Sequence, residues 1–156
     1  MLGPLGFRQL AALAAAALLA GCSAALEPED SARVVRVVDG DTVVLTGLGK
    51  TRLIGVDTPE VFGGAECYGR EASRFAHRVL RPGRRVKVTV GVEPRDRYGR
   101  TLAYVFLGRG RTFNEALAAG GYARPLTIRP NDDLAPEIDE AARRARAARR
   151  GLWARC

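Results

Sequence analysis

The sequence has one histidine, three cysteines, no internal repeat and no low-complexity segment after its alanine-rich start. The histidine, His77, lies off the apolar face of an expected helix, so we interpret it as a solvated surface residue rather than a ligand or catalytic base. The uncharged apolar run at residues 10–20 is about 11 residues long, which is too short to span a membrane as a mature helix. The part of the chain that follows this apolar run is long enough for one folded domain.

The N-terminal segment has the features of an export signal. The apolar run follows Arg8 and ends in Leu19-Ala20-Gly21-Cys22, which resembles a bacterial lipobox, where the cysteine receives a diacylglyceryl group and becomes the mature N-terminus. Residues 1–21 are then a lipoprotein signal peptide, Cys22 is the lipidation site, and residues 22–32 form an unstructured tether. This predicts an exported protein anchored to a membrane of the cell envelope. A soluble secreted protein, released by ordinary signal cleavage, is the alternative.

Hydrophobic periodicity indicates a small mixed domain over residues 33–156. Strand patterns cover residues 34–38, 43–45, 50–56, 86–92 and 102–107, and helix patterns cover residues 69–80 and 134–150. A capping box, Thr112-Phe-Asn-Glu115, opens a further short helix and explains Asn114 and Glu115 structurally. Short clustered strands with helices beside them favour an α+β fold with a small closed β-barrel over alternating βαβ units.

A charged turn follows the third expected strand. Asp57-Thr58-Pro59-Glu60 comes directly after an apolar segment that begins with Arg52. Proline restricts its own φ and keeps Thr58 extended, so the two carboxylates are held apart. Asp57 can therefore serve as a metal ligand while Glu60 accepts a proton. A capped turn without chemistry is the alternative, because Asp-Thr-Pro is common in turns.

Two other strand ends carry charges of the same kinds. Asp39-Gly40 is a strong hairpin signal that explains Asp39 but leaves Asp41 unexplained. The segment Asp96-Arg97-Tyr98-Gly99-Arg100 joins two later strands and supplies an arginine. Carboxylates suit a hard cation such as calcium, and arginines bind phosphate through paired hydrogen bonds. Together the three strand ends provide the groups needed to hydrolyse a phosphodiester.

These stretches, with Leu102-Ala-Tyr104 and Phe113-Asn-Glu-Ala-Leu117, resemble the thermonuclease (staphylococcal nuclease-like) family. The match runs in order from about Val34 to Trp153. The resemblance implies a five-stranded OB-fold β-barrel with three helices, whose strand ends form the site. It also implies a calcium-dependent endonuclease that acts on DNA and RNA and leaves 3′-phosphates. We expect a monomer.

The resemblance also implies a role for individual residues. Six residues match functional positions of the family. Asp41 and Asp57 match its metal carboxylates, and Thr58 matches its backbone-carbonyl ligand. Arg52 and Arg100 match its phosphate-binding residues, and Glu60 matches its general base. The chain departs from the family at Leu126 and Ile128, which stand where the best-known members carry nucleotide-binding tyrosines. Because stacking is reduced there, substrate binding is expected to depend more on charge.

Two other functions are compatible with parts of the sequence. An OB-fold that only binds single-stranded nucleic acid would also benefit from the formal charge of +8. Such a binding protein has no use for carboxylates that repel phosphate, so the acids favour the enzyme. A lipoprotein that uses calcium only to stiffen its fold would not need Arg52 and Arg100 beside the acids.

The cysteines predict one further feature. Lipidation of Cys22 leaves Cys67 and Cys156 as an even pair in an exported protein, where a disulfide is the default. The bond would close a loop of roughly 90 residues and stabilise the fold by on the order of 4 to 5 kcal/mol in the chain-entropy model. It would also join the C-terminal tail to the loop that follows Glu60.

Overall fold

The computed structural model describes residues 28, 30–108 and 110–156. The expected signal peptide, Cys22 and most of the expected tether lie outside these residues. The strands are β1 (Asp30–Val37), β2 (Thr42–Leu45), β3 (Gly49–Leu53), β4 (Gly55–Asp57), β5 (Arg85–Arg95), β6 (Thr101–Gly108), β7 (Arg111–Thr112) and β8 (Arg124–Leu126). The helices are α1 (Gly69–Val79), α2 (Phe113–Ala119), α3 (Ala135–Ala147) and α4 (Leu152–Arg155). In this described part, no helix is long and apolar enough to cross a membrane.

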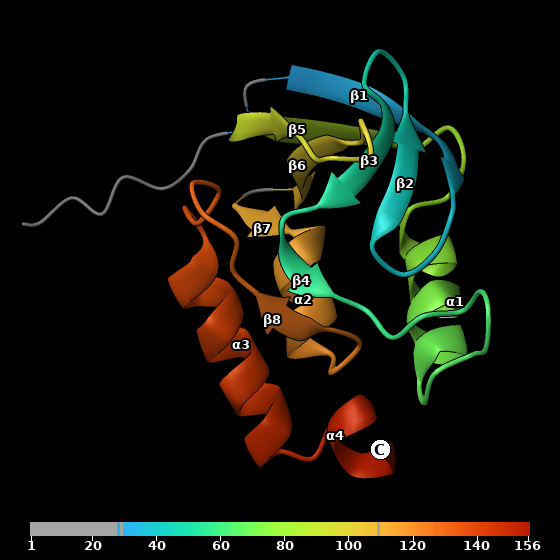
Figure 1. Ribbon diagram of the computed structural model, residues 1–156, viewed down its shortest axis with the longest axis vertical. Helices are drawn as coiled ribbons and strands as arrows, with labels where there is room; N and C mark the ends of the chain where they lie inside the picture. Colours follow the sequence, from blue (N-terminus) through green and yellow to red (C-terminus); the bar gives the residue numbers. More distant parts are fainter. Residues whose placement is uncertain (1–27, 29, 109) are drawn as a thin grey trace, which may run out of the picture.

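Five strands form a closed barrel, which confirms the expected fold. The sheet has the order β3-β2-β1-β5-β6-β7, and an additional pairing joins β3 to β6 (Figure 1). The closing pair is parallel, with Thr51 opposite Thr101 and Leu53 opposite Ala103, whereas β1, β2 and β5 pair with their neighbours in antiparallel fashion. Closure leaves β3 inside the sheet, so the residues at its end are held in place from both sides.

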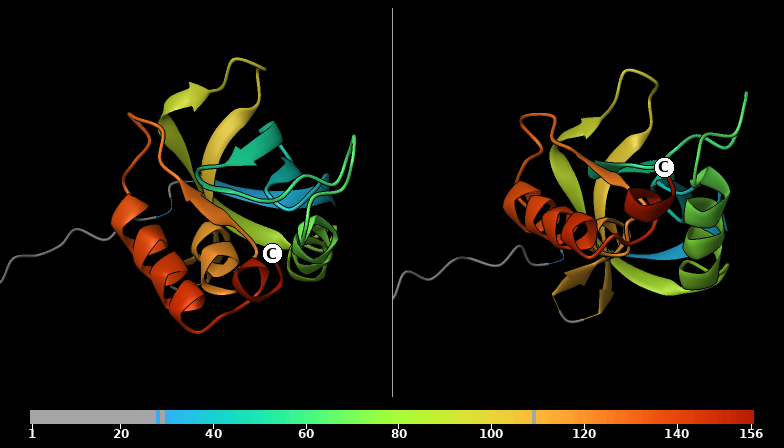
Figure 2. Two further views of the ribbon diagram at one scale, coloured as in Figure 1. Left: turned by 60° about the horizontal axis from the view of Figure 1, so that its bottom comes forward. Right: turned by 90° about the horizontal axis from the view of Figure 1, so that it is seen from below.

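The helices cover one end of the barrel. The helix α2 lies between α1 and α3 in every view (Figures 1 and 2). The expected capping box is confirmed, because the Thr112 hydroxyl accepts a hydrogen bond of 3.0 Å from the Glu115 backbone N–H. Asn114 is also structural: it is fully buried, and its side chain bonds the backbone of Ile54, Ala103 and Val105. Buried amides of this kind tie the barrel to the helix beneath it.

The expected strand over residues 50–56 is wrong as a single element, because it breaks at Gly55. Gly55 has a φ of 80°, a conformation that glycine adopts without steric cost. A Cβ there would also lie 2.6 Å from the Ile138 Cδ1 atom of α3. The chain therefore leaves the barrel after β3, and β4 pairs with β8 in a separate two-stranded ribbon. This bend carries Asp57 away from the barrel wall.

The chain ends also differ from expectation. The strand β1 begins at Asp30, where Asp30 to Arg33 pair with β5, so the tether expected over residues 22–32 does not extend to Ala32. Ala32 is buried in the core, which the charged residues around it concealed. The helix expected over residues 134–150 is present as α3, which ends at Ala147, and a further one-turn helix, α4, follows Gly151, which has a φ of 58°. The helix expected over residues 69–80 is confirmed as α1, and His77 lies exposed on it.

Candidate active site

The turn between β1 and β2 packs directly against the end of β4. Asp41 Oδ2 accepts hydrogen bonds of 2.8 Å from both the backbone N–H and the hydroxyl of Thr58. Asp41 and Thr58 are both buried. A Cβ on Gly40 would lie 2.6 Å from the Thr58 hydroxyl oxygen, so the glycine is required here for close approach. The Asp39-Gly40 hairpin is confirmed, and Gly40 also makes room for this contact.

Arg52 connects the two expected metal carboxylates. Its Nη2 lies 3.2 Å from Asp41 Oδ2 and 2.9 Å from Asp57 Oδ1. Its Nη1 donates to the carbonyl oxygens of Leu53 and Val56 at 2.9 and 2.7 Å. The bend at Gly55 makes the second of these contacts possible, because it turns the chain back toward Arg52. The guanidinium is thus held in one orientation by four contacts, and the two carboxylates converge on one of its nitrogens.

Acid groups crowd this turn. Burial raises the pKa of the Asp57 carboxyl, the nearby charge of Asp41 raises it further, and Arg52 opposes both effects. Burial also raises the pKa of Asp39, with the charge of Asp41 as the next cause. Beyond burial, repulsion from Asp41 also disfavours the charged form of each of these carboxyls. A cation bound here would relieve that repulsion.

The donor set fits a hard cation. Asp41, Asp57 and the Thr58 carbonyl offer oxygen ligands, the type that calcium takes in numbers of six to eight. Within residues 28, 30–108 and 110–156, no group of three or more His, Cys, Asp or Glu side chains could hold a metal ion. Two carboxylates that meet at one guanidinium nitrogen, with a neighbouring carbonyl, would leave several coordination positions for water and substrate oxygens.

Glu60 is placed differently from these residues. Its side chain is exposed, and among the described residues its carboxylate makes no hydrogen bond or ion pair. Its backbone is held instead: the Glu60 N–H donates to Glu66 Oε2 at 3.1 Å, and the Glu66 N–H donates to the Glu60 carbonyl at 2.8 Å. A Cβ on Gly69 would lie 2.5 Å from that same carbonyl oxygen. The main chain at Glu60 is therefore fixed, whereas the carboxylate is free to meet a water molecule.

A disulfide lies beside this loop. Cys67 and Cys156 are bonded, with Cα atoms 5.9 Å apart and a sequence separation of 89. Cys67 follows Glu66 directly, and Cys156 ends the segment that contains α4. The bond thus joins Cys156 to Cys67, the neighbour of Glu66, which holds the Glu60 backbone.

Arg100 belongs to the loop between β5 and β6. Its Nε donates to Asp96 Oδ2 at 2.6 Å, while the backbone N–H groups of Tyr98 and Arg100 donate to Asp96 Oδ1, each at 2.9 Å. Burial alone would raise the pKa of Asp96, but the hydrogen bonds from Arg100 and Tyr98 outweigh burial and lower it. Asp96 stays charged and orients the guanidinium of Arg100.

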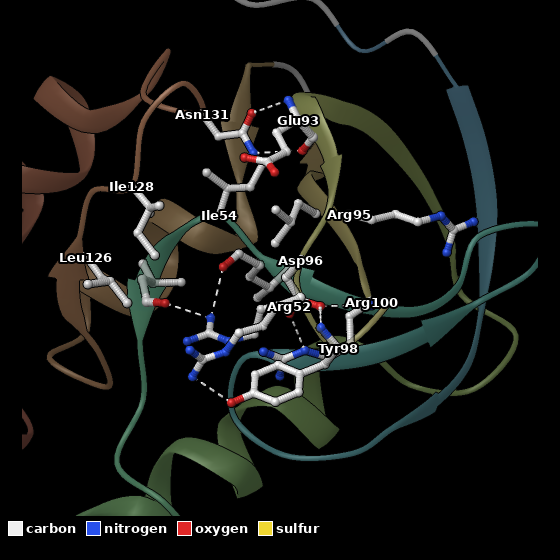
Figure 3. A pocket seen from close by; sticks show the side chains of 15 residues that line it. Arg52, Ile54, Glu93, Arg95, Asp96, Tyr98, Arg100, Leu126, Ile128 and Asn131 are labelled. Carbon is white, nitrogen blue, oxygen red and sulfur yellow. Dashed lines mark hydrogen bonds and ion pairs between the residues drawn. The ribbon is translucent and has the colours of Figure 1, made fainter.

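A pocket of about 490 Å³ lies between these elements. Figure 3 shows Arg52 and Arg100 on its wall, with Tyr98 at one side and Leu126 and Ile128 at another. The Tyr98 ring is exposed, and the guanidinium carbons of Arg97 and Arg100 lie 4.8 and 5.4 Å from its centroid. Two cations and an aromatic face thus line an open, partly apolar pocket, a combination that suits a phosphate and a base.

Comparison with known proteins agrees with this geometry. Residues 50–155 match the family model described as staphylococcal nuclease homologue. The chain belongs to the staphylococcal nuclease family. It is similar to the thermonucleases of Staphylococcus hyicus and Staphylococcus intermedius, at 41% identity to each, over 80% and 81% of this chain and 76% and 77% of the relatives. It is also 34% identical, over 81% of its length, to 12% of the endonuclease YhcR of Bacillus subtilis.

In this family member, the structure groups the expected site residues into two sets. Asp41, Arg52, Asp57 and Thr58 contact one another, and Arg52 also lines the pocket with Arg100. Glu60 contacts none of them and stands alone beyond Thr58 and Pro59. Arg52 is the residue common to the acids and the pocket.

Sequence reasoning missed two features of the site of this staphylococcal nuclease homologue. The first is Tyr98, whose ring is exposed between two arginines, a sequence pattern that can indicate a binding surface. The second is Glu66, which no local pattern indicates, because its bonds to the Glu60 backbone depend on the path of the loop between them. Leu126 and Ile128 both line the pocket that contains Arg52 and Arg100.

Proposed function

We propose that this protein is a calcium-dependent endonuclease that hydrolyses phosphodiester bonds of DNA and RNA and leaves 3′-phosphates. The observation that carries the proposal is the position of Arg52, which touches Asp41 and Asp57 while it lines the pocket. A phosphate in the pocket would therefore lie next to the two carboxylates. Membership of a family whose relatives are named thermonuclease and endonuclease supports the nuclease reaction.

Asp41, Asp57 and the Thr58 carbonyl would hold the calcium ion. When bound, calcium would polarise a phosphoryl oxygen and neutralise its charge. Arg52 and Arg100 would bind phosphate oxygens from two sides of the pocket, each oriented in advance by carboxylates, Asp41 and Asp57 for Arg52 and Asp96 for Arg100. Arg100 uses only its Nε for Asp96, so both of its Nη groups can meet phosphate, whereas Arg52 would offer its Nε–H or exchange a carboxylate for a phosphate oxygen.

Glu60 would accept the proton of the attacking water. Its carboxylate has no competing partner among the described residues, and the bonds to Glu66 hold its backbone. A positioned general base contributes roughly 10² to 10⁴ in rate. Phosphate ester hydrolysis requires a larger acceleration than this, so the cation and the two arginines would supply most of it.

Non-catalytic binding of single strands is the second candidate, since OB-folds often bind nucleic acid through a basic groove. The buried contact of Asp41 with Thr58 and the convergence of Asp57 on the same guanidinium speak against it. In a protein that only binds a polyanion, such acids would lower the affinity by repelling phosphate. We further propose that the enzyme is a monomer held at the cell envelope by lipidated Cys22, because its N-terminal segment has the features of a lipobox.

Cleavage assays on the mature domain test the proposal. Nicking of plasmid DNA and degradation of RNA should require calcium and stop in excess chelator. Arg100→Ala should lose most activity while the circular dichroism spectrum and melting temperature stay close to wild type, because the backbone N–H groups of Tyr98 and residue 100 would still hold Asp96. Full activity in chelator, or in folded Arg100→Ala, would show that the assigned roles are wrong.

A further inference from the structure

A second group of arginines surrounds an aromatic ring on the C-terminal side of the molecule. The guanidinium carbons of Arg124, in β8, and Arg146, in α3, lie 6.0 and 5.5 Å from the centroid of the Trp153 ring. The indole Nε1 is buried and has no hydrogen-bond partner within the described residues. An arginine near an indole is stabilised and oriented by the ring. The Trp153 ring therefore favours the placement of two guanidinium groups on one surface.

Both guanidinium groups are available to a ligand. Arg124 and Arg146 are exposed, and among the described residues neither side chain makes a hydrogen bond or an ion pair. In contrast, Arg143 and Arg144 on the same helix pair with Glu140. Next to the ring is a shallow depression of about 180 Å³, lined by Pro125, Asp139, Ala142, Arg143, Arg146 and Trp153. The lining has one acid, Asp139, and two arginines, of which Arg143 is paired with Glu140. The positive charge that can attract an anion here comes from Arg146 and the adjacent Arg124.

This surface is next to the candidate active site. In the antiparallel β4–β8 ribbon, Arg124 is directly opposite Asp57, so both side chains lie on the same face. Leu126 is on that face too, and it lines the pocket that contains Arg52. Two residues of strand cover roughly 7 Å. A strand of nucleic acid that followed β8 would pass from the pocket at Leu126 to the paired positions of Asp57 and Arg124.

We propose that Arg124 and Arg146, oriented by Trp153, form a second phosphate-binding subsite for the polynucleotide strand that leaves the active site. This inference rests on the proposed function. The pocket has a cluster of the same composition, in which Arg97 and Arg100 flank Tyr98. The catalytic acids then lie between two arginine–aromatic clusters. A polymer can reach both clusters, whereas a mononucleotide reaches one.

Trp153 is the sole tryptophan of the chain, so its emission reports directly on the subsite. Binding is measured in chelator, without cleavage, with thymidine 5′-monophosphate and with a single-stranded oligothymidylate of about ten nucleotides. The oligomer should change Trp153 emission and the mononucleotide should not. In Arg124→Gln/Arg146→Gln, oligomer affinity should fall about tenfold. The salt slope should become shallower by about 1.4, which corresponds to two lost phosphate contacts on a single strand.

The matched control removes two other exposed arginines. Arg81→Gln/Arg85→Gln takes away the same charge, and neither side chain lies over an aromatic ring in the described residues. With calcium, the ratio of kcat/KM for the oligomer to kcat/KM for a dinucleotide should fall about tenfold in the Arg124/Arg146 variant. In the control that ratio should stay within twofold of wild type.

The two proposals fail in different ways. Equal effects of the two double variants on oligomer affinity, or Trp153 emission that does not respond to the oligomer, would overturn the subsite even if the enzyme cleaves DNA. An emission change that depends on Arg124 and Arg146 in a protein without hydrolytic activity would support the subsite and overturn the nuclease.

Discussion

The two halves of the candidate active site are built in different ways. Asp41, Arg52 and Thr58 are buried or nearly so and joined by hydrogen bonds at the end of a closed barrel. Glu60 is exposed, and its backbone depends on Glu66 in the loop that follows. Groups on strands are held more exactly than groups on loops. Of the expected metal ligands, Asp41 and Thr58 are therefore part of the fold itself, and Asp57 is an exposed side chain held by Arg52. The expected base is positioned by a loop and a disulfide.

Among the changes that separate the two halves, the largest effect is expected for Glu60→Gln, which removes the base but keeps its size. We expect kcat to fall by roughly 10² to 10⁴, the contribution of a positioned general base. Calcium affinity and melting temperature should change little, because the Glu60 side chain contacts none of the other site residues in the described part of the chain. Steady-state kinetics with calcium titration measure this. A matching loss of calcium affinity would mean that Glu60 is also a metal ligand.

Removal of the disulfide tests the loop half as a whole. In Cys67→Ser/Cys156→Ser the free energy of unfolding should fall by up to about 4 to 5 kcal/mol, the chain-entropy value for a loop of this length. Below the melting temperature, kcat should fall more than calcium affinity, since Asp41 and Thr58 are held without this bond. Denaturant unfolding and calcium titration report the two effects. Reduced wild type is the control and should behave like the variant; two reactive thiols in the unreduced protein would show that no bond forms.

Gly40→Ala tests the barrel half. The added methyl group would lie 2.6 Å from the Thr58 hydroxyl oxygen, and overpacking of this kind costs about 1 to 3 kcal/mol. Because Thr58 would have to move away from Asp41, calcium affinity should fall as well. Gly108→Ala is the control, since no atom of the described residues lies within 4 Å of a Cβ there. Thermal melts and calcium titrations of both variants test this. Equal melting temperatures and equal calcium affinities in the two variants would contradict the prediction.

The smallest effect on the rate is expected when the hydrogen bond from the Glu60 backbone to the Glu66 side chain is removed. Glu66→Ala removes the acceptor of the Glu60 N–H, and we expect kcat to fall about tenfold, equivalent to one hydrogen bond to a charged group. KM should change less than kcat. Glu66→Gln keeps a side-chain oxygen that can accept the same bond and should restore most of the rate. If Gln and Ala behave alike, Glu66 acts through its charge and not through positioning.

Interactions between residues close in sequence determined several secondary-structure elements and the candidate residues of the site. The Asp39-Gly40 hairpin, the capping box at Thr112 and the amphipathic helix over residues 69–80 each depend on residues close in sequence, so the sequence alone was sufficient to predict them. The same holds for the candidate residues in the turn from Asp57 to Glu60, because proline restricts its neighbours wherever it occurs. The spacing of several such motifs was enough to indicate the family.

Tertiary structure alone decided how these residues meet. The bond from Thr58 to Asp41 spans 17 residues, and it forms because Gly40 leaves room for Thr58. The division of the third expected strand at Gly55 depends on the Ile138 side chain of a helix more than 80 residues later. Arg124 reaches Trp153 because α4 is joined to the core by its own packing and by the disulfide. Contacts of this kind depend on volumes and positions set by the whole chain, which local residue patterns do not encode.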